Sequence, residues 1–290
     1  EFVYANSHGF TGGYKGSAHY IGCAMVASDG DDMERDDWYT SHRVAAEMEA
    51  AEDVGRKAGE RAAARLKPRK ISTQSAAVIF TPQVAGGFIG HAISALFGGS
   101  LYRKTSFLLD AMGTQKFASL LNIIDDPYIP RSYASSPFDG EGVACQRRSI
   151  IENGVVRGYF LSSYSARKLG MTTTGNAGGN HNLLVSPTIK GDTATLAKQM
   201  GRGLIVTELM GQGVNAVTGD YSRGAAGFWV EGGAIAHPVS EITIAGNLLD
   251  LYQRIVAIGD DVDRRGSKHV GSILIESMQI ARSEEHTSEL

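Results

Sequence analysis

The stretch that most constrains how this chain can fold is residues 207–247, TELMGQGVNAVTGDYSRGAAGFWVEGGAIAHPVSEITIAGN, which contains eight glycines. A segment so rich in glycine is usually a linker or disordered. This one also holds Phe228, Trp229, Ile242 and Ile244, whose side chains need burial. We therefore expect its glycines to mark tight turns and close backbone approach between strands of a folded domain.

Composition excludes several classes of partner. The 290 residues are 42% hydrophobic, enough for a large core in one or two domains. A net charge of −3 argues against nucleic acid or a membrane surface as a partner, and no apolar run reaches the roughly 20 residues that cross a bilayer. The two cysteines, Cys23 and Cys145, suggest neither a disulfide scaffold nor a CxxC site. A reducing, cytoplasmic location is expected.

The sequence at the two ends of the chain differs in character from its interior. The first residues, Glu1 to Tyr4, lack every feature of a signal peptide and look like a chain entered mid-protein. Residues 282–290, RSEEHTSEL, turn abruptly polar and resemble the translation of a sequencing-library adapter. We interpret them as a non-native tail and leave them out of the fold prediction.

The first part of the chain, residues 1–70, predicts one strand and one long helix. Residues 17–28 have the composition of a strand. Apolar residues recur at helical spacing over residues 41–66, with Ser41 as a plausible N-cap and Pro68 as the stop.

A second unit, residues 71–281, predicts more strands than helices. Its strongest helix signals are Thr81-Pro82 before residues 83–96, ended by Gly98-Gly99, and Asp192 before residues 193–200. Asn153-Gly154 predicts a type I′ hairpin. Further elements are expected as strands at 76–80, 204–209 and 271–275 and helices at 162–169 and 247–258. The predicted fold class is α+β, with twisted antiparallel β-sheets and flanking helices.

No motif for chemistry is complete. Gly211 to Ala216 imitates a dinucleotide fingerprint, but the residues that follow do not open the helix that this fingerprint requires. His91 lies on the helix after Pro82 without a second His or an acidic residue on that helix, so it cannot form a zinc-protease helix by itself. A lone His on an apolar helix is more often a hydrogen-bonded core residue.

Asp220, Tyr221, Ser222 and Arg223 form a short charged island within the glycine-rich stretch. The arginine could bind a carboxylate in a polar site. Equally, the four residues could be a turn in which Asp220 pairs with Arg223 or caps backbone amides. Both interpretations stay open at this point.

Several long segments resemble one family. TELMGQGVNAVTGDYSRGAAGFWVEGG, HPVSEITIAGNL, SSYSARKLG with TTTGNAGGNHN, and GGSLYRKTSFLLD are similar to the PmbA (TldE) branch of the TldD/PmbA family. The resemblance covers residues 1–281 and reads as the C-terminal two-thirds of a member. It implies that residues 1–70 are the end of a central α/β domain and that residues 71–281 are a C-terminal α+β domain.

The resemblance also implies a division of labour between two subunits. A TldD-type subunit carries zinc on an HExxxH helix and hydrolyses unfolded or leader peptides. The TldE-type subunit is its partner in a cytoplasmic heterodimer. If the second His of HExxxH is placed on His91, the first His falls on Gly86 and the Glu on Gly87, and residues 260–281 lack the Cys ligand of the active subunit.

These departures predict a subunit without catalytic or metal-binding residues, in which His91 is all that remains of the pattern. His91, Asp220, Tyr221, Ser222 and Arg223 are then candidates for contact with a peptide or with the partner. Zinc is expected in the TldD-type subunit and no cofactor in this chain. Two alternatives remain, an independent metal-dependent or nonmetal peptidase and a stand-alone peptide-binding or regulatory protein.

Overall fold

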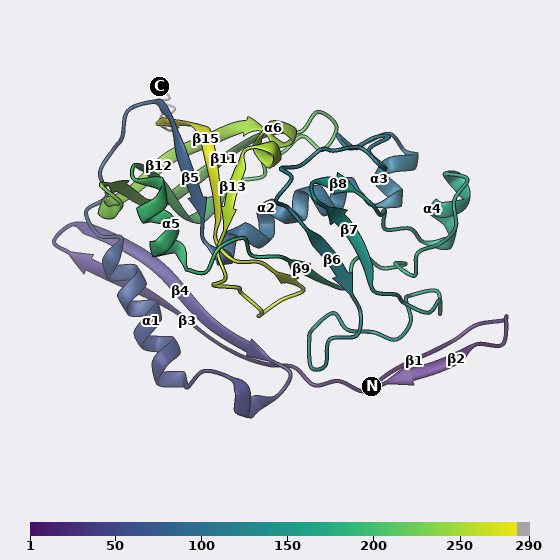
Figure 1. Ribbon diagram of the computed structural model, residues 1–290. Coiled ribbons are helices and arrows are strands. Elements are labelled where there is room, and N and C mark those ends of the chain that lie inside the picture. The colour runs from purple at the N-terminus through teal and green to yellow at the C-terminus, as the bar shows by residue number, and fades with distance from the viewer. Residues whose placement is uncertain (283–290) are drawn as a thin grey trace, which may run out of the picture.

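The computed structural model describes residues 1–282 and is α+β, as predicted (Figure 1). The predicted tail lies outside the described residues except for Arg282, which ends the last strand. No helix within residues 1–282 is both long enough and apolar enough to cross a membrane.

The N-terminal part is built from two hairpins and a helix. The hairpins pair β1 with β2 and β3 with β4, and helix α1 packs on the second through Val54, Ala58 and Ala62. Their bounds are Phe2–Ala5 for β1, Thr11–Tyr14 for β2, His19–Asp29 for β3, Asp32–His42 for β4, and Ala51–Ala64 for α1 after a 3₁₀ turn at Ala45–Glu47.

The long helix predicted over 41–66 is therefore wrong at its start. Ser41 lies in β4 instead of capping a helix, and α1 begins at Ala51. Strand β4 escaped prediction because the inward side chains of its first half, such as Glu34 and Asp36, are charged instead of apolar. Asp36 accepts a hydrogen bond from Arg61 of α1 at 3.0 Å, so ion pairs replace the hydrophobic alternation that normally marks a strand.

The C-terminal part contains two sheets. The larger has the strand order β12-β11-β10-β5-β15-β13, and an additional pairing of β12 with β15 closes five of these strands into a ring. The smaller has the order β14-β9-β6-β7-β8. Most neighbours are antiparallel; β10 with β5 and β14 with β9 are parallel.

The bounds of the elements in this part are as follows: β5 Gln74–Phe80, α2 Pro82–Ala95, α3 Gly98–Tyr102, β6 Ile123–Asp126, β7 Arg148–Glu152, β8 Val155–Val156, α4 Ser163–Lys168, β9 Asn182–Val185, α5 Thr193–Met200, β10 Gly203–Met210, β11 Asp220–Glu231, β12 Ala234–Asn247, α6 Leu248–Gln253, β13 Ile255–Ile258, β14 Lys268–His269 and β15 Ile273–Arg282.

The glycine-rich stretch forms strands joined by turns, as predicted. Gly232 and Gly233 have positive φ angles of 58° and 79° in the turn between β11 and β12. A Cβ atom at Gly227 would collide with the carbonyl oxygen of Ile205 on the neighbouring strand. The hairpin at Asn153 is also confirmed, because both of its turn residues have positive φ.

Two other predictions are corrected. The final helix stops at Gln253, and Ile255–Ile258 pairs with β15 as an edge strand, consistent with its β-branched residues. Helix α2 ends at Ala95, and Gly98 begins the next helix instead of closing this one. Gly98 is needed there because a Cβ would strike the side chains of Ser165 and Leu161.

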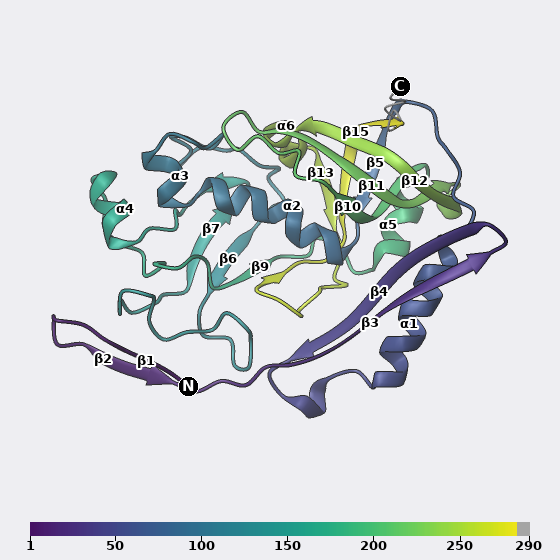
Figure 2. The same ribbon diagram turned by 180° about the vertical axis from the view of Figure 1, so that it is seen from behind.

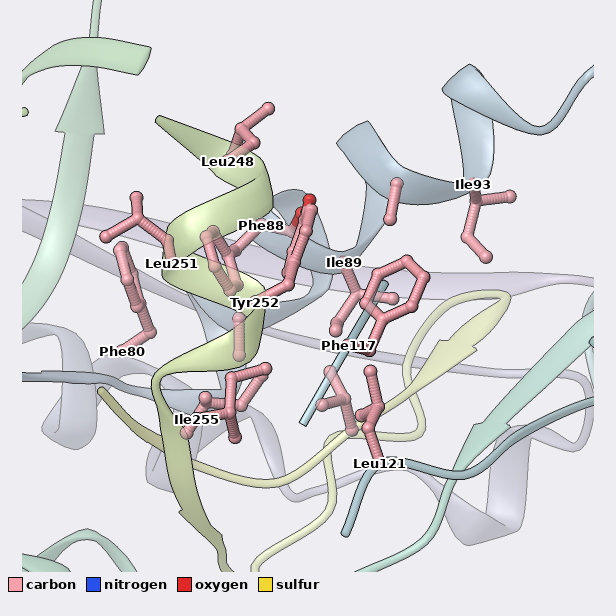
Figure 3. Close-up of a cluster of buried hydrophobic side chains, with 14 of the residues drawn as sticks. Phe80, Phe88, Ile89, Ile93, Phe117, Leu121, Leu248, Leu251, Tyr252 and Ile255 are labelled. Carbon is pink, nitrogen blue, oxygen red and sulfur yellow. The ribbon is translucent and has the colours of Figure 1, made fainter. Parts of the chain in front are cut away.

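Helix α2 lies between the two sheets and forms the centre of the core. Its inner face meets α6 and strand β5 in a cluster that includes Phe80, Phe88 and Tyr252 (Figure 3). The rings of Phe88 and Tyr252 have centroids 4.7 Å apart, and the Tyr252 hydroxyl donates a 2.7 Å hydrogen bond to the Phe88 carbonyl. Helix α5 packs on the opposite face of the larger sheet, where Leu196 contacts Ile205 and Val230.

The burial of α2 predicts a large stability difference between two isoleucines. Ile89 is fully buried on α2, whereas Ile235 on β12 is 58% exposed. Ile89→Ala is expected to lower the free energy of unfolding by about 2–5 kcal/mol, and Ile235→Ala by no more than about 1 kcal/mol. Urea denaturation of both variants measures the difference. Equal losses would contradict this description of the core.

Candidate functional site

The outer face of α2 carries few side chains. Thr81 stands at the N-cap position, although its hydroxyl donates to the Val206 carbonyl at 3.2 Å instead of capping the helix. The outer face consists of Gln83, Gly86, Gly87, Gly90 and Ser94. No strand or helix lies in front of α2 in Figure 2. The three glycines add no side chain to this stripe, and the backbone is most exposed at Gly87.

Lys268 of β14 lies along one side of this stripe. A Cβ at Gly90 would stand 3.2 Å from the Lys268 Cε atom, tighter than an ordinary contact. A Cβ at Gly86 would meet the Lys268 Cβ at 3.8 Å, whereas one at Gly87 would find no atom within 4 Å. The lysine side chain thus covers the row of Gly86 and Gly90 and leaves Gly87 open.

His91 lies on the other side of Gly87, beside strand β11. Successive helical residues are about 100° apart, so His91 and Gly86 are separated by about 140° around the axis with Gly87 between them. The rings of His91 and Tyr221 have centroids 5.9 Å apart at an interplanar angle of 71°. Because side chains alternate along a strand, Tyr221 and Arg223 are on the same side of β11.

The predicted four-residue island is therefore divided between the two sides of a strand. Asp220 and Ser222 are exposed on the side away from Tyr221. Asp220 accepts hydrogen bonds from the Thr218 hydroxyl at 2.6 Å and from Asn247 at 3.3 Å, and it does not pair with Arg223. The interpretation of these residues as a turn is wrong, because residues 220–231 run as one strand between β10 and β12.

Tyr221 is almost completely buried, and its hydroxyl has no hydrogen-bond partner among the described residues. Burial raises the pKa of Tyr221 to about 12, with Arg223 acting in the opposite direction. The tyrosine is therefore a neutral hydroxyl at physiological pH, placed between Phe88 and His91.

Positive charge gathers around His91. Burial lowers the pKa of His91, and the charges of Arg223 and Lys268 lower it further. Neither Arg223 nor Lys268 has a carboxylate within 4.0 Å among residues 1–282, although both are only partly exposed. The Arg223 Nε donates one long bond of 3.4 Å to the Met210 carbonyl. His91 is thus neutral at pH 7 in a positive environment.

These residues do not fit a zinc ion. Gly86 and Gly87 supply no donor, and two cations beside His91 would repel a divalent metal. Within the described chain no group of three His, Cys, Asp or Glu side chains could hold a metal. Cys145 is buried, and burial raises the pKa of its thiol to about 12.

Lys268 was not predicted from sequence. It is 177 residues from His91 in the chain, and only the parallel pairing of β14 with β9 places it against α2. A lone lysine in a short loop-like segment carries no signal of that contact.

A second polar cluster lies under the loop at residues 174–181, which precedes β9. The fully buried Asp125 accepts from the His181 Nδ1 at 3.1 Å and from Asn176 at 2.9 Å. Arg148 donates to Asn176 at 2.7 Å. These bonds fasten the loop to β6 and β7, so their role is accounted for by the fold.

A cleft of about 730 Å³ lies elsewhere, between the β4 end and the smaller sheet. Its polar groups pair with one another. His42 contacts Glu47 at 3.1 Å, and Ser132 lies 3.3 Å from the His269 Nε2 while donating to Asn182 at 2.7 Å. None of the five residues singled out from sequence as site candidates lines this cleft, so the α2 face remains the better-defined candidate site.

The charges around His91 predict its titration. Because burial, Arg223 and Lys268 all lower its pKa, His91 should titrate below the ordinary histidine value of about 6.5. Arg223→Gln and Lys268→Gln should each raise that pKa part of the way, since burial is the largest cause and remains. The contribution of His91 to the free energy of unfolding is then fully present above the pKa of the unfolded state. It decreases as the pH falls below that value. NMR titration of the imidazole Cε1 proton checks both; a His91 pKa at or above 6.5 would contradict the geometry.

Comparison with known proteins follows the same division of the chain. The PmbA/TldA metallopeptidase central domain matches residues 1–66, and the PmbA/TldA metallopeptidase C-terminal domain matches residues 73–282. The chain is 49% identical to the Metalloprotease PmbA of Escherichia coli O157:H7 over 280 residues, which are 96% of this chain and 62% of that protein. The chain thus spans less than two thirds of that relative.

Solved structures share the fold. A candidate modulator of DNA gyrase from Bacteroides thetaiotaomicron matches with a TM-score of 0.90 at 30% identity, over 95% of this chain and 62% of that one. TldE from Thermococcus kodakarensis matches with a TM-score of 0.84 at 23% identity, over 95% and 65%, as a likeness of fold. The resemblance predicted from sequence is confirmed, and the chain belongs to the TldD/PmbA family, in its PmbA branch.

Proposed function

We propose that this chain is the noncatalytic subunit of a cytoplasmic, two-subunit metallopeptidase that hydrolyses unfolded or leader peptides. The observation that carries the proposal is the outer face of α2. Where a zinc-binding helix of this family would present a histidine and a glutamate, this one has Gly86 and Gly87. Lys268 lies along the same face, and its charge opposes a metal there.

The bare face suits contact with another backbone. Gly86, Gly87 and Gly90 each cost about 1 kcal/mol of helix stability relative to alanine, so their presence on one stripe favours a role that needs close approach. In the proposed complex, the TldD-type subunit holds the zinc, and this chain covers the reaction chamber. It also presents sheet edges to which an extended peptide adds as a strand.

The division of labour predicts where zinc and activity are found. The purified full-length chain should bind no stoichiometric zinc and should not cleave a flexible peptide. The TldD-type subunit co-expressed with it should carry zinc, and the pair should be more active than either subunit. Elemental analysis and peptide hydrolysis measure this. One tightly bound zinc per copy of this chain, or chelator-resistant hydrolysis by this chain alone, would favour an independent peptidase. Failure to co-purify with a TldD-type subunit would favour a stand-alone binding protein.

A glycine-to-alanine pair tests the role of the bare face. Gly87 on α2 and Gly59 on α1 both leave a new Cβ in open space. Gly87→Ala and Gly59→Ala should therefore each raise the free energy of unfolding by about 1 kcal/mol. Only Gly87→Ala should weaken association with the partner or hydrolysis by the complex. If both variants behave alike in the complex, the outer face of α2 is not a contact surface.

A further inference from the structure

Two cations beside α2, Lys268 and Arg223, border a strip of surface and make it positively charged. Lys268 lies along Gly86 and Gly90 on one side, and His91 contacts Tyr221 on the other, with Arg223 on the same side of β11 as Tyr221. Gly87 lies between them with open space above its Cβ position. The floor of the strip is helix backbone, and both of its sides are basic.

The charges of this strip are not neutralised by the protein. Among the other partly buried arginines, Arg65 contacts Glu34 and Glu208 and Arg265 contacts Asp263 at 2.7 Å, whereas Arg43 and Arg148 donate to carbonyl or amide oxygens of the protein. Arg223 and Lys268 have no such carboxylate among the described residues, and their charges together disfavour protonation of His91. An anion lying between them would gain attraction from both without displacing an existing ion pair.

The chemistry of the strip favours a carboxylate. One guanidinium and one ammonium match a single planar carboxylate, which Arg binds through parallel N–H groups. The chain as a whole has a net charge of −3, which opposes a polyanion such as nucleic acid. The neutral imidazole of His91 and the glycine floor leave room for peptide backbone to follow the carboxylate.

We propose that Arg223 and Lys268 form a binding site for a peptide carboxylate above Gly87, so that this subunit anchors extended peptides through a negative charge on the peptide. The peptide as ligand rests on the proposed function; the carboxylate preference rests on the charges alone. The carboxylate has two possible sources, the free C-terminus of a peptide or an acidic side chain.

Binding of short peptides to the full-length chain tests the site. Four fluorescein-labelled tetrapeptides are compared by fluorescence anisotropy at low salt: neutral side chains with a free C-terminus, the same peptide amidated, an amidated peptide containing one Glu, and the matching amidated Gln peptide. A free C-terminal carboxylate as the source predicts about tenfold tighter binding of the first peptide than of the second. An acidic side chain predicts the same ratio between the third and the fourth.

Variants locate the site. Arg223→Gln and Lys268→Gln should each weaken binding of the preferred peptide about tenfold and remove its preference for a carboxylate. Gly87→Leu should block the strip, because leucine would occupy its open floor. Lys198→Gln is the matched control, since Lys198 is exposed on α5 at the opposite face of the sheet. Circular dichroism confirms that each variant is folded.

Two results would overturn the proposal. One is equal affinity for carboxylate and amide within both pairs of peptides. The other is a carboxylate preference that survives in folded Arg223→Gln and Lys268→Gln. A bound carboxylate should also raise the pKa of His91, because it offsets both neighbouring charges. All of these measurements use this chain without a partner, so they stand or fall separately from the hydrolysis experiments on the complex.

Discussion

The packing of α2 against the core is the interaction on which the rest of the structure depends. Phe88 and Ile89 are fully buried, and the Tyr252 hydroxyl bonds to the backbone of the same helix turn. This contact fixes the rotation of α2 about its axis. Once the inner face is fixed, the positions of Gly86, Gly87 and His91 on the outer side follow from the helical repeat.

That rotation also decides which distant segments meet the outer side. The parallel pairing of β14 with β9 brings Lys268 over Gly86 and Gly90, and the β11 register brings Tyr221 beside His91. Gly90 matters most here, because a Cβ there would stand only 3.2 Å from the lysine chain. The lysine can lie against the helix because that position has no side chain.

Local signals predicted much of the fold and part of the site. Pro82, Asn153-Gly154 and Asp192 each act within a few residues, and the elements they mark are present. Strand β4 was missed because its inward face is held by ion pairs to α1, a partner that periodicity cannot reveal. The grouping of His91 with Tyr221 and Arg223 was anticipated as candidates, but Asp220 and Ser222 were included only because strand alternation had not been recognised.

The same alternation determines the sign of the charge at the site. Had Asp220 and Arg223 faced the same way, they would have neutralised each other, and the face of α2 would carry little net charge. Instead β11 turns Arg223 toward His91, while Asp220 bonds to Thr218 and Asn247 on the other side. A metal site needs donors that attract a cation, whereas this face joins two cations to a neutral imidazole. These charges favour the approach of an anion to α2 over that of a metal ion.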